Sequence, residues 1–204
     1  MSMTHALGLL AHPTREWHTI REESCTEQPS ILNFILTYLL FITAIPAVCG
    51  YLGTTLTGWQ LPGSPETVYL THTSAAIIAV LSYFATLAAI LATSGFVHWM
   101  ARTFDVSPSF AQCLTFTAYT ATPLLVGGLA ALSPSLWLAM IVGIIMIGWS
   151  AYLLYTGIPV FMNIPFERGV IFASSVLCVA LVVLVATMAI SVTLWNLGAG
   201  PIYL

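Results

Sequence analysis

Charged residues are scarce in this sequence. Asp, Glu, Lys and Arg make up 5% of its 204 residues, lysine is absent, and the formal net charge at pH 7 is −3. A soluble domain carries roughly 25% charged residues, so four basic and seven acidic residues cannot cover a water-facing surface of this length. Four scattered arginines form no basic patch, and we therefore expect no nucleic-acid partner.

Sequence patterns typical of enzymes are missing as well. The sequence has no HExxH zinc motif, no GxSxG nucleophile motif and no phosphate-cradling glycine loop. The four cysteines have no partner at metal-ligand spacing, and they are Cys25, Cys49, Cys113 and Cys178. We predict a protein that is not an enzyme, with no catalytic residue, no cofactor and no metal site.

Long hydrophobic runs are abundant instead. Hydrophobic residues make up 59% of the chain, and its mean hydropathy is +0.97. A helix needs about 20 apolar residues to cross the hydrocarbon core of a bilayer. Five runs are long enough and contain no charged residue, and they cover residues 31–53, 68–98, 110–132, 136–158 and 170–196. The sequence therefore predicts an all-α polytopic membrane protein, a five-transmembrane-helix bundle over residues 31–204.

The second run is longer than a span requires, so we expect it to tilt or to begin with a surface turn near His72. None of the five runs contains Asp, Glu, Lys or Arg. An ionisable residue inside the membrane is the usual mark of a proton relay or of a coupling-ion site. Its absence counts against a proton-coupled pump.

The arginines predict the orientation in the membrane. Arg15 and Arg21 precede the first span, Arg102 lies between spans two and three, and Arg168 lies between spans four and five. With five spans, these three segments share one side, and the opposite side has no arginine. Positively charged residues favour the cytoplasmic side. We therefore expect a cytoplasmic N-terminus and a periplasmic C-terminus.

Residues 1–30 form the cytoplasmic N-terminal segment and hold six of the charges. Pro13 suits the first turn of a helix, and Trp17 and Ile20 share one face after it. This pattern predicts a short amphipathic helix over residues 13–24, which lies on the membrane surface with Trp17 and Ile20 as its interfacial anchor. A solvated helix or a frayed tail is the alternative.

Unusual residues lie on one helical face of the third span and of the fourth. On the third they are spaced by seven, four and four residues, and they are Gln112, Tyr119, Pro123 and Gly127. On the fourth the spacings are four, three and four, and they are Gly148, Tyr152, Tyr155 and Pro159. The tight turn at 133–135 makes these spans antiparallel neighbours, so the two faces are expected to meet.

The contact between the third and the fourth span has two interpretations. The residues line a ligand crevice, or they form a packed seam of small residues and hydrogen bonds. Pro123 predicts a kink and leaves the carbonyl group of Tyr119 without its helical donor, which Thr120, Thr122 or a tyrosine of the fourth span would supply. We favour the packed seam.

A polar group is predicted at the cytoplasmic end of the second span. His98 lies four residues before Arg102, and Asp105 follows. The three are expected to form an interfacial cluster. Alternatively, His72 and His98 only anchor the two ends of this helix at the water boundary.

Three stretches carry recognisable motifs. Residues 13–23 follow a Pro-x-x-x-Trp-x-x-Ile-x-x-Glu pattern, 118–129 contain Tyr-x-x-x-Pro, and 151–165 contain Tyr-x-x-Tyr-x-Gly followed by prolines. In this order they resemble the Yip family of five-span membrane proteins, of the Ypt- or Rab-interacting-protein type, and especially its bacterial branch. The resemblance implies an integral inner-membrane protein. Eukaryotic members bind Rab-type GTPases through a longer N-terminal domain, and residues 1–30 show no GTPase-docking motif.

Two functions agree with these features. The first is a non-enzymatic membrane scaffold or adaptor, whose partners are the lipid bilayer and either another membrane protein or a second copy of the chain. The second is a transporter or channel for a neutral or weakly polar solute, which would pass through a crevice between spans three and four. The absence of intramembrane charges favours the scaffold.

Overall fold

The computed structural model describes residues 8–9, 13–26, 31–60, 67–195 and 200–202. Among these residues, five helices are long and apolar enough to cross a membrane, namely Thr37–Thr57, His72–Phe104, Phe110–Leu132, Leu136–Met162 and Phe166–Thr193. A shorter helix, α2 (Pro13–Thr26), precedes them. The all-α, five-span prediction with a short N-terminal helix is therefore confirmed.

The first span combines several helical segments, which are α3 (Ile31–Phe34), the π-helical η1 (Ile35–Leu39), α4 (Leu40–Leu52) and the π-helical η2 (Gly53–Thr57). Two short antiparallel strands follow, β1 (Trp59–Gln60) and β2 (Thr67–Val68). The second and third spans are α5 (His72–Ala101) with η3 (Arg102–Phe104), and α6 (Phe110–Gly127) with η4 (Gly128–Leu132). The last two spans are α7 (Leu136–Met162) and α8 (Phe166–Leu194).

Two spans begin at other residues than the hydropathy predicted. The second helix begins at His72 because Thr67–Val68 pairs with β1, so the expected surface turn precedes it. The fifth helix begins at Phe166, directly after Pro165, and takes Glu167 and Arg168 into its first turn. Hydropathy excluded these two charged residues from the span, although a helix that reaches beyond the hydrocarbon accommodates them.

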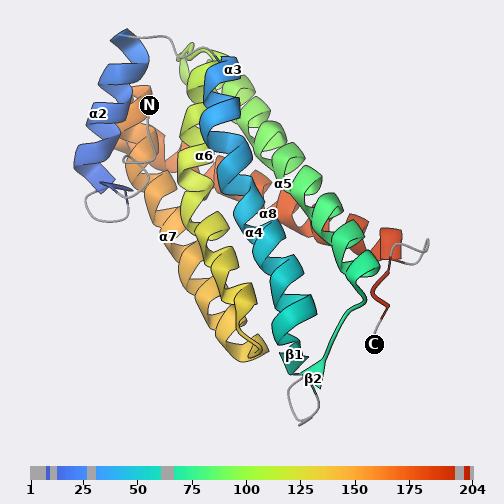
Figure 1. Ribbon diagram of the computed structural model, residues 1–204. Coiled ribbons are helices and arrows are strands. Elements are labelled where there is room, and N and C mark those ends of the chain that lie inside the picture. The colour runs from blue at the N-terminus through green and yellow to red at the C-terminus, as the bar shows by residue number, and fades with distance from the viewer. Residues whose placement is uncertain (1–7, 10–12, 27–30, 61–66, 196–199, 203–204) are drawn as a thin grey trace.

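Helix α6 lies at the centre of the bundle (Figure 1). In its most apolar stretch 61% of the residues are buried within the protein, against 6% for α7 and 11% for the second span. It packs against α4, α5 and α7, while α8 packs against α5 and α7 and α2 packs against α7. In Figure 1, α8 runs obliquely behind the other helices, from the end of α7 toward the beginning of α5.

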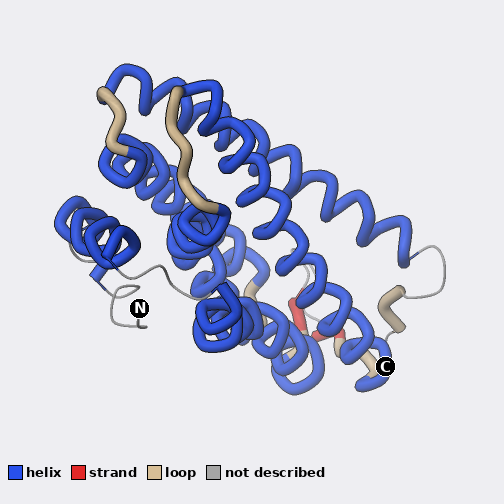
Figure 2. The backbone as a smooth tube through the Cα atoms, turned by 90° about the horizontal axis from the view of Figure 1, so that it is seen from above, coloured by secondary structure: helices blue, strands red, loops and turns tan. Residues whose placement is uncertain are grey.

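Polar contacts tie the loops together at the end of the bundle opposite α2. The strand pair lies near the C-terminus, as Figure 2 shows for the red segments. The Gln60 backbone N–H donates to the Pro134 carbonyl at 2.9 Å, which joins the strands to the turn before α7. The Ser74 hydroxyl donates to the Gly200 carbonyl at 2.9 Å, and this bond joins α5 to the chain after α8. These bonds supply partners for backbone groups outside helices, which need them near a membrane.

Candidate functional site

The tyrosine of the third span, Tyr119, packs against the first span and not against the fourth. Tyr119 is fully buried, and its ring centroid lies 4.8 Å from that of Tyr38 and 5.9 Å from that of Phe34. The Tyr38 hydroxyl lies 2.6 Å from the Thr122 hydroxyl. The polar seam is therefore built between η1 and α6. The sequence showed which residues share a face of the third span, but not which helix that face contacts.

The residues predicted on one face of the fourth span have two different surroundings: some lie on the outer surface of the bundle, and others contact α8. Tyr152 is 47% exposed and its ring packs against Trp149, with centroids 5.7 Å apart. A Cβ atom added at Gly148 would meet nothing within 4 Å. Tyr155 turns to α8 instead, where its hydroxyl lies 2.9 Å from that of Ser174.

The predicted contact between these two faces, as a crevice or as a packed seam, is therefore wrong. Helices α6 and α7 are neighbours, but their close contact is made by Gly127, where an added Cβ atom would lie 2.9 Å from Cγ of Met146. Pro159 packs against Gly169 of α8 in the same way. Small residues permit such close approach of helices in membranes.

The polar residues of α6 serve mainly their own helix. Gln112, expected on the shared face, completes a capping box: its side-chain oxygen accepts from the Ser109 backbone N–H at 2.8 Å. The hydroxyl groups of Thr120 and Thr122 donate to the carbonyls of Phe116 and Ala118, at 2.8 and 2.9 Å. They do not take the role predicted for them at the carbonyl freed by Pro123.

The N-terminal helix buries its apolar face in the protein. Trp17 and Ile20 are both 0% exposed, so they are not inserted into lipid as predicted. The indole ring lies 5.0 Å from the Phe116 ring and 6.2 Å from the Phe161 ring, between centroids. An added Cβ atom at Gly157 would lie 2.7 Å from the indole, so the glycine makes room for it. We call this set of Phe116, Gly157 and Phe161 the tryptophan slot.

A charged side chain fastens the same helix to the end of α7. The Arg21 guanidinium donates to the Val160 carbonyl at 3.2 Å and to the Asn163 side-chain oxygen at 3.1 Å. Asn163 ends α7 in a left-handed conformation, with φ 54°. A cation at the C-terminal carbonyls of a helix is favourable because the negative end of the helix dipole lies there.

The predicted cluster of His98, Arg102 and Asp105 forms only in part. His98 donates from Nδ1 to the Pro108 carbonyl at 3.1 Å. The Asp105 backbone N–H donates to the Arg102 carbonyl at 3.3 Å, and its carboxylate lies 3.9 Å from the guanidinium of Arg168 on α8. The Asp105–Arg168 pair is largely exposed and contributes little stability, but it brings the loop after the second span next to the first turn of α8.

Sequence reasoning missed a cavity at the middle of the bundle. Its volume is about 370 Å³, and its walls come from α5, α6, α7 and α8, with Pro46 of α4. We call it the central cavity. The sequence carried no signal for it, because the space depends on how four helices are placed relative to one another.

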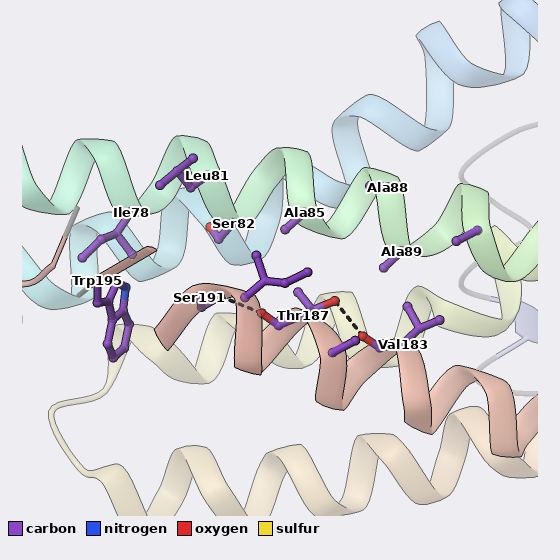
Figure 3. Close-up of a pocket in the computed structure, with 13 residues that line it drawn as sticks. Ile78, Leu81, Ser82, Ala85, Ala88, Ala89, Val183, Thr187, Ser191 and Trp195 are labelled. Carbon is purple, nitrogen blue, oxygen red and sulfur yellow. Dashed lines mark hydrogen bonds between the residues drawn. The ribbon is translucent and has the colours of Figure 1, made fainter. Parts of the chain in front are cut away.

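A second space of about 360 Å³ lies between α5 and α8 alone. Figure 3 shows the two helices side by side, with Ala85, Ala88 and Ala89 of α5 near Val183 and Thr187 of α8. The side chains of Ala89, Val183 and Thr187 line both spaces. Small side chains along α5 leave this groove open on the surface of the bundle.

Comparison with known proteins agrees with this architecture. Residues 7–188 match the Yip1 domain. The chain belongs to the Yip1 domain family. The inner membrane protein YohC of Escherichia coli strain K12 is 39% identical over 196 residues, which are 96% of this chain and 98% of YohC. YohC of Escherichia coli O6:H1 strain CFT073 has the same identity and coverage.

No solved structure matches the chain. The family and its similarity to YohC make this chain a multi-pass protein of the bacterial inner membrane. The Yip1 match begins before α2 and so includes it together with most of the bundle.

The three stretches that resembled the family have different structural roles. In this Yip1 domain Trp17 docks the N-terminal helix, Tyr119 packs the first span onto the third, and Tyr155 joins the fourth span to the fifth. Together they hold helices that are distant in sequence.

Proposed function

We propose that this Yip1 domain protein is a non-enzymatic scaffold or adaptor that holds another membrane protein, or a second copy of itself, in the inner membrane. The docked N-terminal helix is the observation that carries the proposal. Its apolar face is buried in the tryptophan slot and Arg21 holds it to α7, so its polar face is presented in a defined position. The exposed side of α2 includes Arg15 and His18.

A change on that polar face tests the scaffold. We expect Arg15→Glu with His18→Glu to reduce co-purifying membrane proteins at least tenfold, in nanodiscs taken directly from inner membranes, because two carboxylates replace the guanidinium and the imidazole on the surface that a partner contacts. The melting temperature should stay unchanged, since both side chains are exposed. Gln60→Glu, at the other end of the bundle, is the matched control and should keep all partners. An unchanged set of partners in the double variant would overturn the proposal.

The alternative function, passage of a neutral solute between α6 and α7, has less support. Gly127 lies against Met146 in that contact, and the threonine hydroxyls of α6 that could line a polar path donate to backbone carbonyls of their own helix. We expect liposomes with the purified protein to pass water, ions and small sugars no faster than protein-free vesicles. Measurable flux would favour the transporter over the scaffold.

We further propose that the N-terminus is cytoplasmic and the C-terminus periplasmic. Arg21, Arg102 and Arg168 lie at the α2 end of the bundle, which supports this orientation by the positive-inside rule. Alkaline phosphatase, which is active only in the periplasm, should be active when fused after residue 204 and inactive when fused before residue 1. The reverse pattern would refute the orientation.

A further inference from the structure

We infer that the central cavity binds one acyl chain of a membrane phospholipid. Each of its walls comes from the middle of a helix: residues 86–93 of α5, 116–125 of α6, 147–154 of α7 and 176–187 of α8. The cavity therefore lies near the midplane of the bilayer, where the surrounding solvent is hydrocarbon. This inference is independent of the proposed scaffold function.

The cavity opens to the bilayer on one side. Leu124, Ile147 and Leu181 line it and are 36%, 38% and 45% exposed, whereas Phe116 and Val176 at its inner side are buried. Near its beginning, α8 contacts α7 through the Tyr155 and Ser174 hydroxyls, and Phe172 stacks on Phe104 at the end of the second span. Farther along, α8 lies beside α5 (Figure 1). An acyl chain can therefore enter laterally without crossing a polar layer.

The chemistry of the walls fits hydrocarbon better than a polar solute. Among the residues that the structure describes, no Asp, Glu, Lys, Arg or His lines the cavity. Its threonines at 86, 93, 117, 120 and 187 all donate their hydroxyl protons to carbonyls four residues earlier, at 2.7 to 2.8 Å. Their methyl groups remain for van der Waals contact. Only Ser150 among the lining hydroxyls is buried without a hydrogen-bond partner in the described part of the chain.

The dimensions also suit an acyl chain. The wall along α8 covers residues 176–187, which is about 16 Å at a rise of about 1.5 Å per residue. One leaflet contributes roughly 15 Å to the hydrocarbon core, so the terminal half of an acyl chain reaches a cavity near the midplane. The volume of about 370 Å³ is more than twice that of the roughly 150 Å³ apolar cavity known to hold benzene. Left empty, a space of this size would leave its lining side chains without van der Waals contacts on the side that faces it.

Photo-crosslinking tests the inference. The full chain is reconstituted with phosphatidylethanolamine that carries a diazirine at the terminal carbon of one acyl chain, and the adducts are located by mass spectrometry. We expect adducts on inner residues such as Phe116, Thr120 and Leu154. We expect Ala180→Phe, which fills the cavity, to reduce them at least tenfold. Val185→Phe, an exposed change on the same helix, is the matched control and should leave them unchanged.

Other outcomes identify other occupants. Adducts confined to exposed residues such as Val182 and Met188 would show that lipid only surrounds the protein and would overturn the inference. In a parallel experiment with a diazirine-bearing amino acid in place of Leu181, crosslinks between two copies together with an absence of inner lipid adducts would assign the cavity to a second copy and overturn the inference. If Ser150→Ala abolished the inner adducts, a polar ligand group would be required and a plain acyl chain would be excluded. Should Ala180→Phe fail to fold, Ala151→Leu replaces it as the cavity-filling variant.

Discussion

Trp17→Ala should release the N-terminal helix from the bundle. The indole ring is fully buried against Phe116 and Phe161, and removing a buried tryptophan side chain typically costs about 3–5 kcal/mol. This loss of free energy weakens the packing of α2 on the bundle before it affects the spans, because α2 packs mainly on α7. Amide hydrogen exchange in α2 should therefore accelerate by roughly a hundredfold or more, since about 1.4 kcal/mol corresponds to tenfold.

Two controls separate packing from polarity at this position. The indole nitrogen has no hydrogen-bond partner among the described residues, so Trp17→Phe should keep α2 docked with a much smaller loss of protection. His18→Ala changes the exposed side of the same helix and should have no effect. If exchange in α2 were equally slow in Trp17→Ala and in the wild type, the tryptophan slot would not be what holds the helix.

Gly128→Leu should unfold or strongly destabilise the bundle. A Cβ atom at this position would lie 2.6 Å from Cβ and 2.7 Å from Cα of Pro46, and a backbone atom within α4 cannot move aside alone. Overpacking in a core costs about 1–3 kcal/mol and occasionally more, and this site belongs to the upper end because the helix itself must shift. The expected result is a lower melting temperature in detergent and a lower yield of folded protein.

Gly143→Leu is the matched control for that variant. Both positions are glycines in apolar helices, but an added Cβ atom at Gly143 would meet nothing within 4 Å. We expect the melting temperature of Gly143→Leu to equal that of the wild type. Equal destabilisation by both variants would mean that glycine at these positions matters for helix geometry, and not for the contact with Pro46.

The two glycines illustrate the limit of sequence reasoning here. Both lie in apolar stretches, and both look suited to close helix packing. Gly128 meets Pro46 of a helix that is about eighty positions earlier in the chain, whereas Gly143 faces the outside of the protein. Apolar residues face both lipid and protein in a membrane bundle, so hydrophobic patterning does not reveal which face of a span is internal.

The same limit explains why two predictions were wrong: the contact between the faces of spans three and four, and the insertion of Trp17 into lipid. Tyr152 and Tyr155 are three residues apart, yet one is half-exposed and the other contacts Ser174. Trp17 suits a lipid interface as well as a protein slot, since its amphipathic ring fits both. The tertiary structure favours the protein slot, because Gly157 leaves room for the indole ring there.

The sequence by itself determined the class of the protein, the number of its spans and its N-terminal helix. Those conclusions depend on the hydrocarbon thickness and on the cost of charge in lipid, which act on each segment separately. The tertiary structure alone decided that α6 is central, that Tyr119 meets Tyr38, that Trp17 is buried, and that α8 leaves a cavity at mid-depth. These features depend on shape complementarity between helices, and no single span carries that information.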